Sequence, residues 1–422
     1  GGSDDDIIYA NAGNNWIMGG GGSDRIYGGS GNDIIYGDLG EVGTVATLNA
    51  PGGNNFIFAR QGNNIIFGGA GNDVIVGGSG NDILVGGYGR IVNGVLIVDA
   101  TVGGNDVIIS RGGHNVLVGG AGNDRLVSGD DAAFIQSLAS QNIDLAAVGS
   151  HNGFFGNNVL VGDNARITLA NGLATRVEGL NNVSGTDTLT ATAGNNFMMG
   201  GGGSDDITGG SGNDVIFGDN GLFTLSQPLG RLLTFATLHP SFGGDDTIRG
   251  TAGNNLILGG AGGDTIDGGS GNDIIFGDFG TGTLVDGVLT RVWTLETTGG
   301  GNDTITGGGG NNVIFGGPGD DGITVTVGNN LLFGDHGVAV FADGSADAWD
   351  AWTTHANTGG ADRITTGAGS AVIFGGFGAD TITSGTGNDF IFGDAGRVTR
   401  NAAGQVLRME STDFSFGGND TI

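Results

Sequence analysis

The sequence predicts an all-β repeat protein, a solenoid in which short strands alternate with glycine-rich turns. Three observations predict it: a nine-residue unit that recurs along the chain, 96 glycines in 422 residues, and a large aliphatic residue at a fixed place in each unit. The chain has only 4 prolines and no Gly-X-Y period, so a collagen helix is excluded. A short fixed period is typical of proteins that stack one structural unit on the next.

The repeating unit reads G-G-x-G-x-D-x-U-x, where U is a large aliphatic residue. Clear copies occupy residues 30–36, 79–85, 211–217 and 270–276. The unit resembles the RTX, or haemolysin-type calcium-binding, nonapeptide repeat, the type found in large secreted bacterial surface proteins and adhesins. The motif is long, constrained by glycine and repeated many times, so the resemblance is specific.

The resemblance implies a right-handed parallel β-roll. The first six positions form a turn that glycine permits, and the last three form a strand whose U side chain points into the core. Two units make one coil, with turns on opposite sides of the roll. In this family Ca²⁺ ions lie between turns of successive coils, held by backbone carbonyls and Asp carboxylates, and such all-oxygen ligation suits calcium.

The charge of the chain points the same way. Asp and Glu total 44 against 14 Lys and Arg, which gives a formal charge of −30. Such a chain repels nucleic acid and anionic membranes, and it resists compaction unless cations neutralise it. A disordered acidic chain is the alternative, but a hydrophobic fraction of 37% in regular positions argues against it. We therefore expect multiple bound Ca²⁺ ions and neither a nucleic-acid partner nor membrane insertion.

A longer period lies above the nine-residue unit. Four units are followed by a Gly-Asp stop, such as Gly37-Asp38 or Gly277-Asp278, and then by a less regular segment. The modules start near residues 1, 50, 101, 182, 241, 298 and 357, and an eighth starts at 415, so we expect one continuous roll over 1–422. Residues 128–152 interrupt the third module, and Asp130 and Asp131 there could cap a helical insert over 132–147. Because the chain begins in one repeat and stops in another, we expect it to be a segment of a longer repetitive protein.

The sixth position of each unit is the candidate metal ligand. Units one and three of a module turn on the same side of the roll, and there the candidates are Asp6, Asp24, Asp73, Asp106, Asp124, Asp187, Asp205, Asp246, Asp264, Asp303, Asp321, Asp362, Asp380 and Asp420. Units two and four turn on the other side, where the candidates are Asp33, Asp82, Asp214, Asp273 and Asp389. Unit two never carries Asp at this position; it carries Asn in all modules but one, which has Ala371.

This distribution predicts unequal calcium loading of the two sides. Asn offers an oxygen but no charge, and ligand charge tunes calcium affinity, so we expect the strong sites where Asp follows Asp. Alternatively, Asn stands there because it suits turns, and both explanations can hold together.

The strand positions predict what covers the roll. In later modules the strands of units one and three are polar outside, as in Thr304-Ile305-Thr306, whereas those of units two and four are apolar on both faces, as in Val313-Ile314-Phe315. We therefore expect one sheet to face water and the other to be covered. Asn93-Gly94, Asn171-Gly172, Asp286-Gly287 and Asp343-Gly344 are hairpin signals in the less regular segments. These hairpins are predicted to stack as an additional sheet over the apolar face; the alternative is that this face is an assembly interface.

No catalytic motif is found in the sequence, and a periodic array of Asp fits repeated metal ligation better than one active site. The leading hypothesis is a non-enzymatic, calcium-rigidified extracellular rod that serves as a stalk, surface layer or filament, with self-association possible. The second is the calcium-binding part of a secreted toxin or hydrolase exported by type I secretion. An ice-binding roll, known in this family, ranks last because few modules carry the regular Thr and Asn array that it needs.

Overall fold

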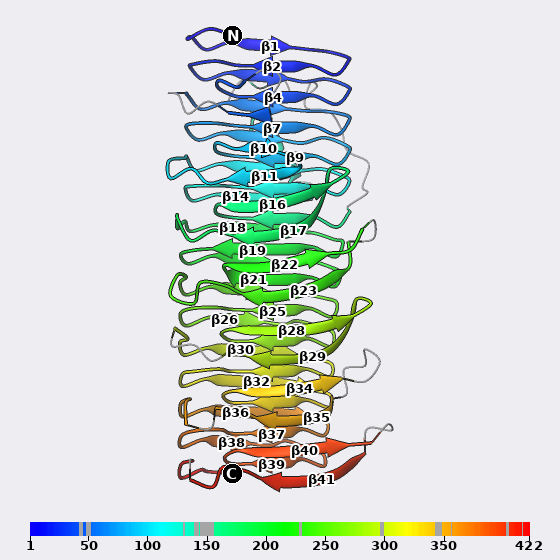
Figure 1. The fold of residues 1–422 in the computed structure, drawn as a ribbon, viewed down its shortest axis with the longest axis vertical. Coiled ribbons are helices and arrows are strands. Elements are labelled where there is room, and N and C mark those ends of the chain that lie inside the picture. Colours follow the sequence, from blue (N-terminus) through cyan, green and yellow to red (C-terminus); the bar gives the residue numbers. More distant parts are fainter. Residues whose placement is uncertain are drawn as a thin grey trace. The chain divides into compact units, whose positions relative to one another are not determined.

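The computed structural model describes residues 1–41, 45–47, 52–129, 131–138, 143, 156–227, 230–295, 299–341, 348–355, 357–401, 405–415 and 417–422. The chain forms two compact units, Gly1–Gly202 and Gly203–Ile422. Each unit is a parallel β-roll whose coils contribute one strand to each of two parallel sheets (Figure 1). Among the described residues, no helix is long and apolar enough to cross a membrane.

The first sheet of each roll is built from the strands of units one and three. In the first compact unit it comprises β1 (Ile7–Tyr9), β3 (Arg25–Tyr27), β6 (Phe56–Phe58), β8 (Val74–Val76), β12 (Val107–Ser110), β14 (Arg125–Ser128) and β18 (Thr188–Ala191). In the second it comprises β20 (Asp206–Thr208), β24 (Thr247–Arg249), β26 (Thr265–Asp267), β30 (Thr304–Gly308), β32 (Gly322–Val327), β36 (Arg363–Ala368) and β38 (Thr381–Thr383).

The second sheet is built from the strands of units two and four. In the first compact unit it comprises β2 (Trp16–Met18), β4 (Ile34–Tyr36), β7 (Ile65–Phe67), β9 (Ile83–Val85), β13 (Val116–Val118), β15 (Val159–Val161) and β19 (Phe197–Gly201). In the second it comprises β21 (Val215–Asp219), β25 (Leu256–Leu258), β27 (Ile274–Phe276), β31 (Val313–Phe315), β33 (Leu331–Phe333), β37 (Val372–Phe374) and β39 (Phe390–Phe392).

A third, antiparallel sheet is made by the hairpins between modules. In the first compact unit it runs β5 (Val45–Ala46), β10 (Arg90–Val92), β11 (Val95–Val98), β16 (Ala165–Ala170) and β17 (Leu173–Gly179). In the second it runs β22 (Gly221–Leu225), β23 (Leu232–Thr237), β28 (Gly280–Val285), β29 (Val288–Thr294), β34 (Gly337–Phe341), β35 (Ala348–Thr353), β40 (Gly396–Arg400) and β41 (Val406–Ser411).

The hairpin turns have the backbone that their sequences predict. Asp286 and Gly287 lie at φ 53° and 78°, and Asn93 and Gly94 at φ 51° and 76°. Two successive positive φ angles define the type I′ turn, whose twist matches that of the two flanking strands. The predicted turn at Asp343-Gly344 lies outside the described residues.

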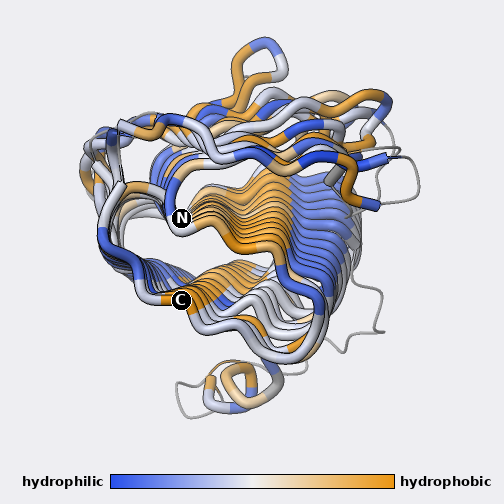
Figure 2. Tube along the Cα trace, turned by 90° about the horizontal axis from the view of Figure 1, so that it is seen from below, coloured by the Kyte–Doolittle hydropathy of each residue, from blue (hydrophilic) through white to orange (hydrophobic). Residues whose placement is uncertain are grey.

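The third sheet covers the second, as expected. Side chains at the last position of the second-sheet strands stack along the roll, for example Phe315 on Phe333 at a ring-centroid distance of 4.7 Å. Both rings are fully buried, and Val292 of the neighbouring hairpin strand is buried too. The U residues between the first and second sheets, such as Ile26 and Ile35, have no exposed surface. Figure 2 shows these apolar strands inside each roll.

The expectation that the first sheet faces water is correct for the second compact unit and wrong for the first. In the first unit Tyr27, Phe58, Val76, Ile109 and Val127 point outward and are nevertheless buried. Ile135, Leu138 and Ile143 of the insert cover them, and α1 (Ala132–Ser137) supplies part of this cover. The sequence Phe56-Ile57-Phe58 shows that the outer side chains of these strands are apolar, and such a face needs a cover. The Thr-rich strands of the second unit do not need one.

The insert is helical where it is described. Helix α1 begins after Asp131, whose side chain accepts a hydrogen bond from the N–H of Phe134 at 3.0 Å. Arg125 of β14 forms an ion pair with Asp131 and lies over the ring of Phe134. Asp130, residues 139–142 and residues 144–155, over which the helix was expected to continue to 147, lie outside the described residues.

Candidate metal centres

The candidate Asp residues of units one and three form one ladder along each roll, on what we call the Asp side. In each compact unit, every ladder carboxylate after the first accepts, at Oδ1, a hydrogen bond from the backbone N–H of the ladder residue in the preceding coil. The N–H of Asp106 donates to Asp124 at 2.7 Å, and the N–H of Asp246 donates to Asp264 at 2.8 Å. The ladder contains Asp6, Asp24, Asn55, Asp73, Asp106, Asp124 and Asp187 in the first unit and Asp205, Asp246, Asp264, Asp303, Asp321, Asp362, Asp380 and Asp420 in the second.

The second oxygen of these carboxylates is the informative one. Among the described residues, Oδ2 is buried and accepts no hydrogen bond in Asp24, Asp73, Asp106, Asp124, Asp246, Asp264, Asp303, Asp321, Asp362 and Asp380. These Asp residues are at most 2% exposed. A buried carboxylate oxygen without a donor is costly, so the recurrence of this arrangement along both rolls indicates a cation.

Glycine brings a carbonyl oxygen to each of these carboxylates. A Cβ placed on Gly259 would lie 2.2 Å from Oδ2 of Asp264 and 2.0 Å from the carbonyl oxygen of Gly277 in the next coil. Gly19 lies in the same way against Asp24 and the carbonyl of Gly37. Any larger residue would fill this space, so glycine keeps carboxylate and carbonyl oxygens together, the donor set that calcium prefers.

Burial and repulsion between carboxylates raise the pKa of Asp246 and Asp264 on the Asp side. Burial is the main cause of the pKa of about 11 for Asp264, and the charges of Asp303 and Asp246 raise it further. Burial likewise raises the pKa of Asp246 to about 10, followed by the charges of Asp219 and Asp205. The apo roll therefore holds protons on groups that calcium would ionise and neutralise.

The other side of each roll, the Asn side, carries the same ladder with amides in it. The N–H of Asn64 donates to Oδ1 of Asp82 at 2.8 Å, and the N–H of Asp82 donates to Oδ1 of Asn115 at 2.8 Å. The candidates Asp33, Asp82, Asp214, Asp273 and Asp389 lie here. Carboxylates are never adjacent in the described part of this ladder.

The Asn side chains of this ladder supply NH₂ donors, which the ladder of the Asp side has only at Asn55 in the described structure. The Nδ2 group of Asn64 donates to the carbonyl of Gly62 at 3.1 Å and to Oδ1 of Asp82 at 2.9 Å. The pKa of Asp82 accordingly rises only to about 6, because burial is opposed by its hydrogen bonds from Asn64. Oδ2 of Asp33 and of Asp273 still lacks a hydrogen bond among the described residues, so the Asn side keeps isolated carboxylate oxygens.

The family model of the RTX calcium-binding nonapeptide repeat matches residues 9–41, 52–87, 101–135, 182–221, 241–284, 297–332 and 357–399, which is more than half of the chain. The chain belongs to the RTX repeat family. RTX repeats of this kind bind Ca²⁺ at multiple sites. No curated protein matches the chain closely enough to be reported as a relative.

The RTX turns fit calcium through backbone oxygens as much as through side chains. Within the described ranges, no three His, Asp or Glu side chains gather closely enough to hold a metal ion together. A bound ion would therefore take carboxylate oxygens from the ladder and complete its shell with turn carbonyls, such as that of Gly277 beside Asp264.

The sequence analysis gave no structural role to the Asp residues of the Gly-Asp stops. In the structure, the Gly-Asp stop of one module and the first unit of the next module form one Asp-side turn, and the hairpin is inserted between them. Asp38 is 2% exposed, and its oxygens accept from the N–H groups of Gly53 at 3.3 Å and Ala70 at 2.6 Å. The Gly-Asp that ends the modules, except the second with Gly86-Gly87, was the signal available in the sequence.

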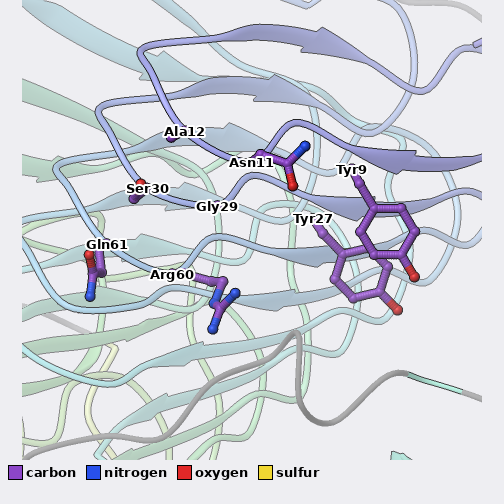
Figure 3. A pocket seen from close by; sticks show the side chains of 8 residues that line it. All are labelled: Tyr9, Asn11, Ala12, Tyr27, Gly29, Ser30, Arg60 and Gln61. Carbon is purple, nitrogen blue, oxygen red and sulfur yellow. The ribbon is translucent and has the colours of Figure 1, made fainter.

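A pocket in the first unit lies apart from these ladders. It has a volume of about 390 Å³ and is lined by Tyr9, Asn11, Tyr27, Arg60 and Gln61, among others (Figure 3). Tyr9 and Tyr27 stack with their ring centroids 4.6 Å apart. Among the described residues, no carboxylate lines this pocket, so it lies apart from the carboxylate ladders.

Proposed function

We propose that this chain is a non-catalytic, calcium-rigidified structural or adhesive segment of an extracellular protein. The observation that carries the proposal is the Asp-side ladder, in which buried Oδ2 atoms recur without a hydrogen-bond donor. Calcium bound there would neutralise adjacent carboxylates and join the turns of successive coils.

The proposed ligands are the ladder carboxylates of both sides. On the Asp side each gap between coils is flanked by carboxylates, apart from the gaps next to Asn55. On the Asn side most carboxylates have amides as neighbours, as Asp82 has in Asn64 and Asn115. Some amides there follow one another, as Asn158 follows Asn115. Because ligand charge tunes affinity, we expect the Asp side to bind first and more tightly. The donors that Asn64 and its equivalents supply reduce the need for an ion on the Asn side.

Folding should be coupled to calcium. Without the ion, the pKa of Asp246 and of Asp264 is raised in the folded state. At neutral pH both groups ionise in the unfolded chain, and this ionisation favours unfolding. Binding to the folded state alone stabilises it by mass action. A chain that stays unfolded at low calcium and folds at the millimolar calcium outside a cell suits a secreted protein, the class in which RTX repeats occur.

A structural or adhesive role is supported by the uniformity of the rolls. The polar groups gather in periodic ladders rather than around one cleft, and periodic carboxylates serve repeated ligation better than one reaction. The outer face of the third sheet carries Trp293 and Trp352 with Arg291 between their rings, at 5.0 and 5.7 Å from the ring centroids. Trp and Arg are the residues most enriched in protein interfaces, so this face is where we expect lateral contacts.

The test is a calcium titration followed by far-UV circular dichroism and static light scattering. We expect a cooperative gain of β-sheet signal between micromolar and millimolar calcium, reversed by a chelator. Scattering that rises with the β-sheet signal would identify a self-assembling filament or surface layer, and constant scattering would identify a monomeric stalk. A full β-sheet signal in chelator, unchanged by calcium, would refute the coupling of folding to metal.

A further inference from the structure

One stop aspartate differs from its equivalents. In Asp38, Asp219 and Asp335, Oδ1 accepts from a glycine N–H of the same expanded turn, and Oδ2 accepts from the third residue of the next Asp-side turn. These third residues are Ala70, Ala261 and Phe377 respectively. Each of these carboxylates is thus satisfied by backbone donors from two successive turns.

At Asp278 the second donor is missing. Oδ1 accepts from the N–H of Gly301 at 3.0 Å, as in the equivalents, but the residue at the position of Ala70 is Pro318. Proline has no backbone N–H. Oδ2 of Asp278 consequently accepts no hydrogen bond among the described residues, although Asp278 is only 1% exposed.

The surroundings of this oxygen are acidic and rich in glycine. A Cβ on Gly317 would lie 2.3 Å from Oδ2 of Asp278, so the oxygen lies in the turn that leads to Asp321. Asp303 and Asp321 are close enough to act on Asp278 electrostatically, and both have an Oδ2 without a donor in the described structure. Three buried carboxylates with unused oxygens in two successive Asp-side turns require positive charge.

We propose that Pro318 turns Asp278 from an acceptor of backbone N–H groups into an additional calcium ligand, so that the Asp-side turns around Asp303 and Asp321 hold one more ion than the equivalent turns of other modules. This inference rests on the calcium-binding role proposed above. It goes beyond that role because it assigns a ligand outside the nonapeptide sixth position and a site that depends on a proline.

The test counts calcium ions per chain by equilibrium dialysis, with circular dichroism at saturating calcium as the control for folding. Pro318→Ala restores the N–H donor that the equivalent turns have, and it should lower the count by one while the chain folds normally. Asp278→Asn removes the charge and should lower the count by the same amount. The converse variant Ala261→Pro removes the N–H that donates to Oδ2 of Asp219, in a turn where Asp246 and Asp264 take the places of Asp303 and Asp321, and it should raise the count by one.

The outcomes separate this inference from the wider proposal. If the wild-type chain binds no calcium in dialysis, the proposed calcium-dependent function fails. If the wild type binds calcium but Pro318→Ala and Asp278→Asn keep the same count, the special role of Asp278 is wrong, and its carboxyl is simply protonated. An Ala261→Pro chain that folds and gains no ion would also count against the proposal.

Discussion

The two sides of each roll share one backbone and differ in how often Asn replaces Asp at the sixth position of the unit. On the Asp side, adjacent carboxylates such as Asp246 and Asp264 each leave Oδ2 without a donor in the described part of the chain. On the Asn side, the amide of Asn64 supplies hydrogen bonds to a carbonyl and to the neighbouring carboxylate. Amides therefore satisfy part of the turn from within on the Asn side, whereas we propose that a cation does so on the Asp side. Replacing one carboxylate oxygen with an NH₂ group changes which partner the turn needs.

The largest effect is expected from removing two neighbouring carboxylates on the Asp side. Asp246→Asn with Asp264→Asn should raise the calcium concentration at the folding midpoint by about tenfold or more, because ligand charge sets affinity. The matched control on the Asn side, Asp214→Asn with Asp273→Asn, removes the same charge and should shift the midpoint by less than about threefold. Circular dichroism against free calcium measures both, and equal shifts would contradict the difference between the sides.

The same Asp-side variant should act in the opposite direction without calcium. In chelator its loss of buried like charges should leave it with more β-sheet signal than the wild type, because it lacks the carboxyls whose pKa burial and repulsion raise to about 10 and 11. A variant less folded than wild type under both conditions would show that the carboxylates stabilise the roll even without metal.

The pH dependence should also separate the two sides. A carboxyl whose folded-state pKa is raised contributes stability that is complete below its unfolded pKa, near 3.8, and is lost as pH rises through the folded pKa. For Asp82 and Asp273 on the Asn side this loss ends near pH 6 to 7, whereas for Asp246 and Asp264 it continues to about pH 10 to 11. In chelator, β-sheet signal should therefore grow as pH falls from 9 to 5. With calcium present the trend should reverse, because protons compete with the ion.

A smaller effect is expected from removing one of the Asn side chains that take the place of Asp on the Asn side. Asn64 is 1% exposed, and Asn64→Ala removes its bonds to Gly62, Asp82 and the N–H of Asp33. Leaving these buried groups unsatisfied should lower the free energy of unfolding by about 1–3 kcal/mol in calcium. Denaturant unfolding measures this, and Asn64→Asp is the informative companion because it should lose stability in chelator and gain a calcium ion.

The smallest loss of stability is expected from a substitution at Asn63, one residue before Asn64. Asn63 is exposed, and its side chain accepts a hydrogen bond from the N–H of Asn81 at 2.8 Å in an outer ladder. Because water can replace that bond, Asn63→Ala should change the free energy of unfolding by less than about 1 kcal/mol. A loss as large as that of Asn64→Ala would mean that the outer ladder, and not burial, holds the Asn side together.

Much of the fold could be read from the sequence because its contacts repeat with the period. The nine-residue unit fixed each strand and turn, Asp286-Gly287 and Asn93-Gly94 gave hairpin turns, and the apolar pattern of Val313-Ile314-Phe315 showed that the second sheet needed a cover. The cover of the first sheet in the first unit was missed. The insert that supplies Ile135 and Leu138 follows no repeat, and only packing shows which strands it covers.

By itself the sequence determined the roll, its two unlike sides and the calcium chemistry of this RTX chain, because strand period, glycine positions and the choice of Asp or Asn are local properties. Only the tertiary structure decided which carboxylate oxygens are satisfied. The donor for Asp38 comes from Ala70, 32 residues along the chain, and the donor that Asp278 lacks would have come from Pro318. A hydrogen bond between coils depends on what the next coil presents, and that is settled when the coils stack.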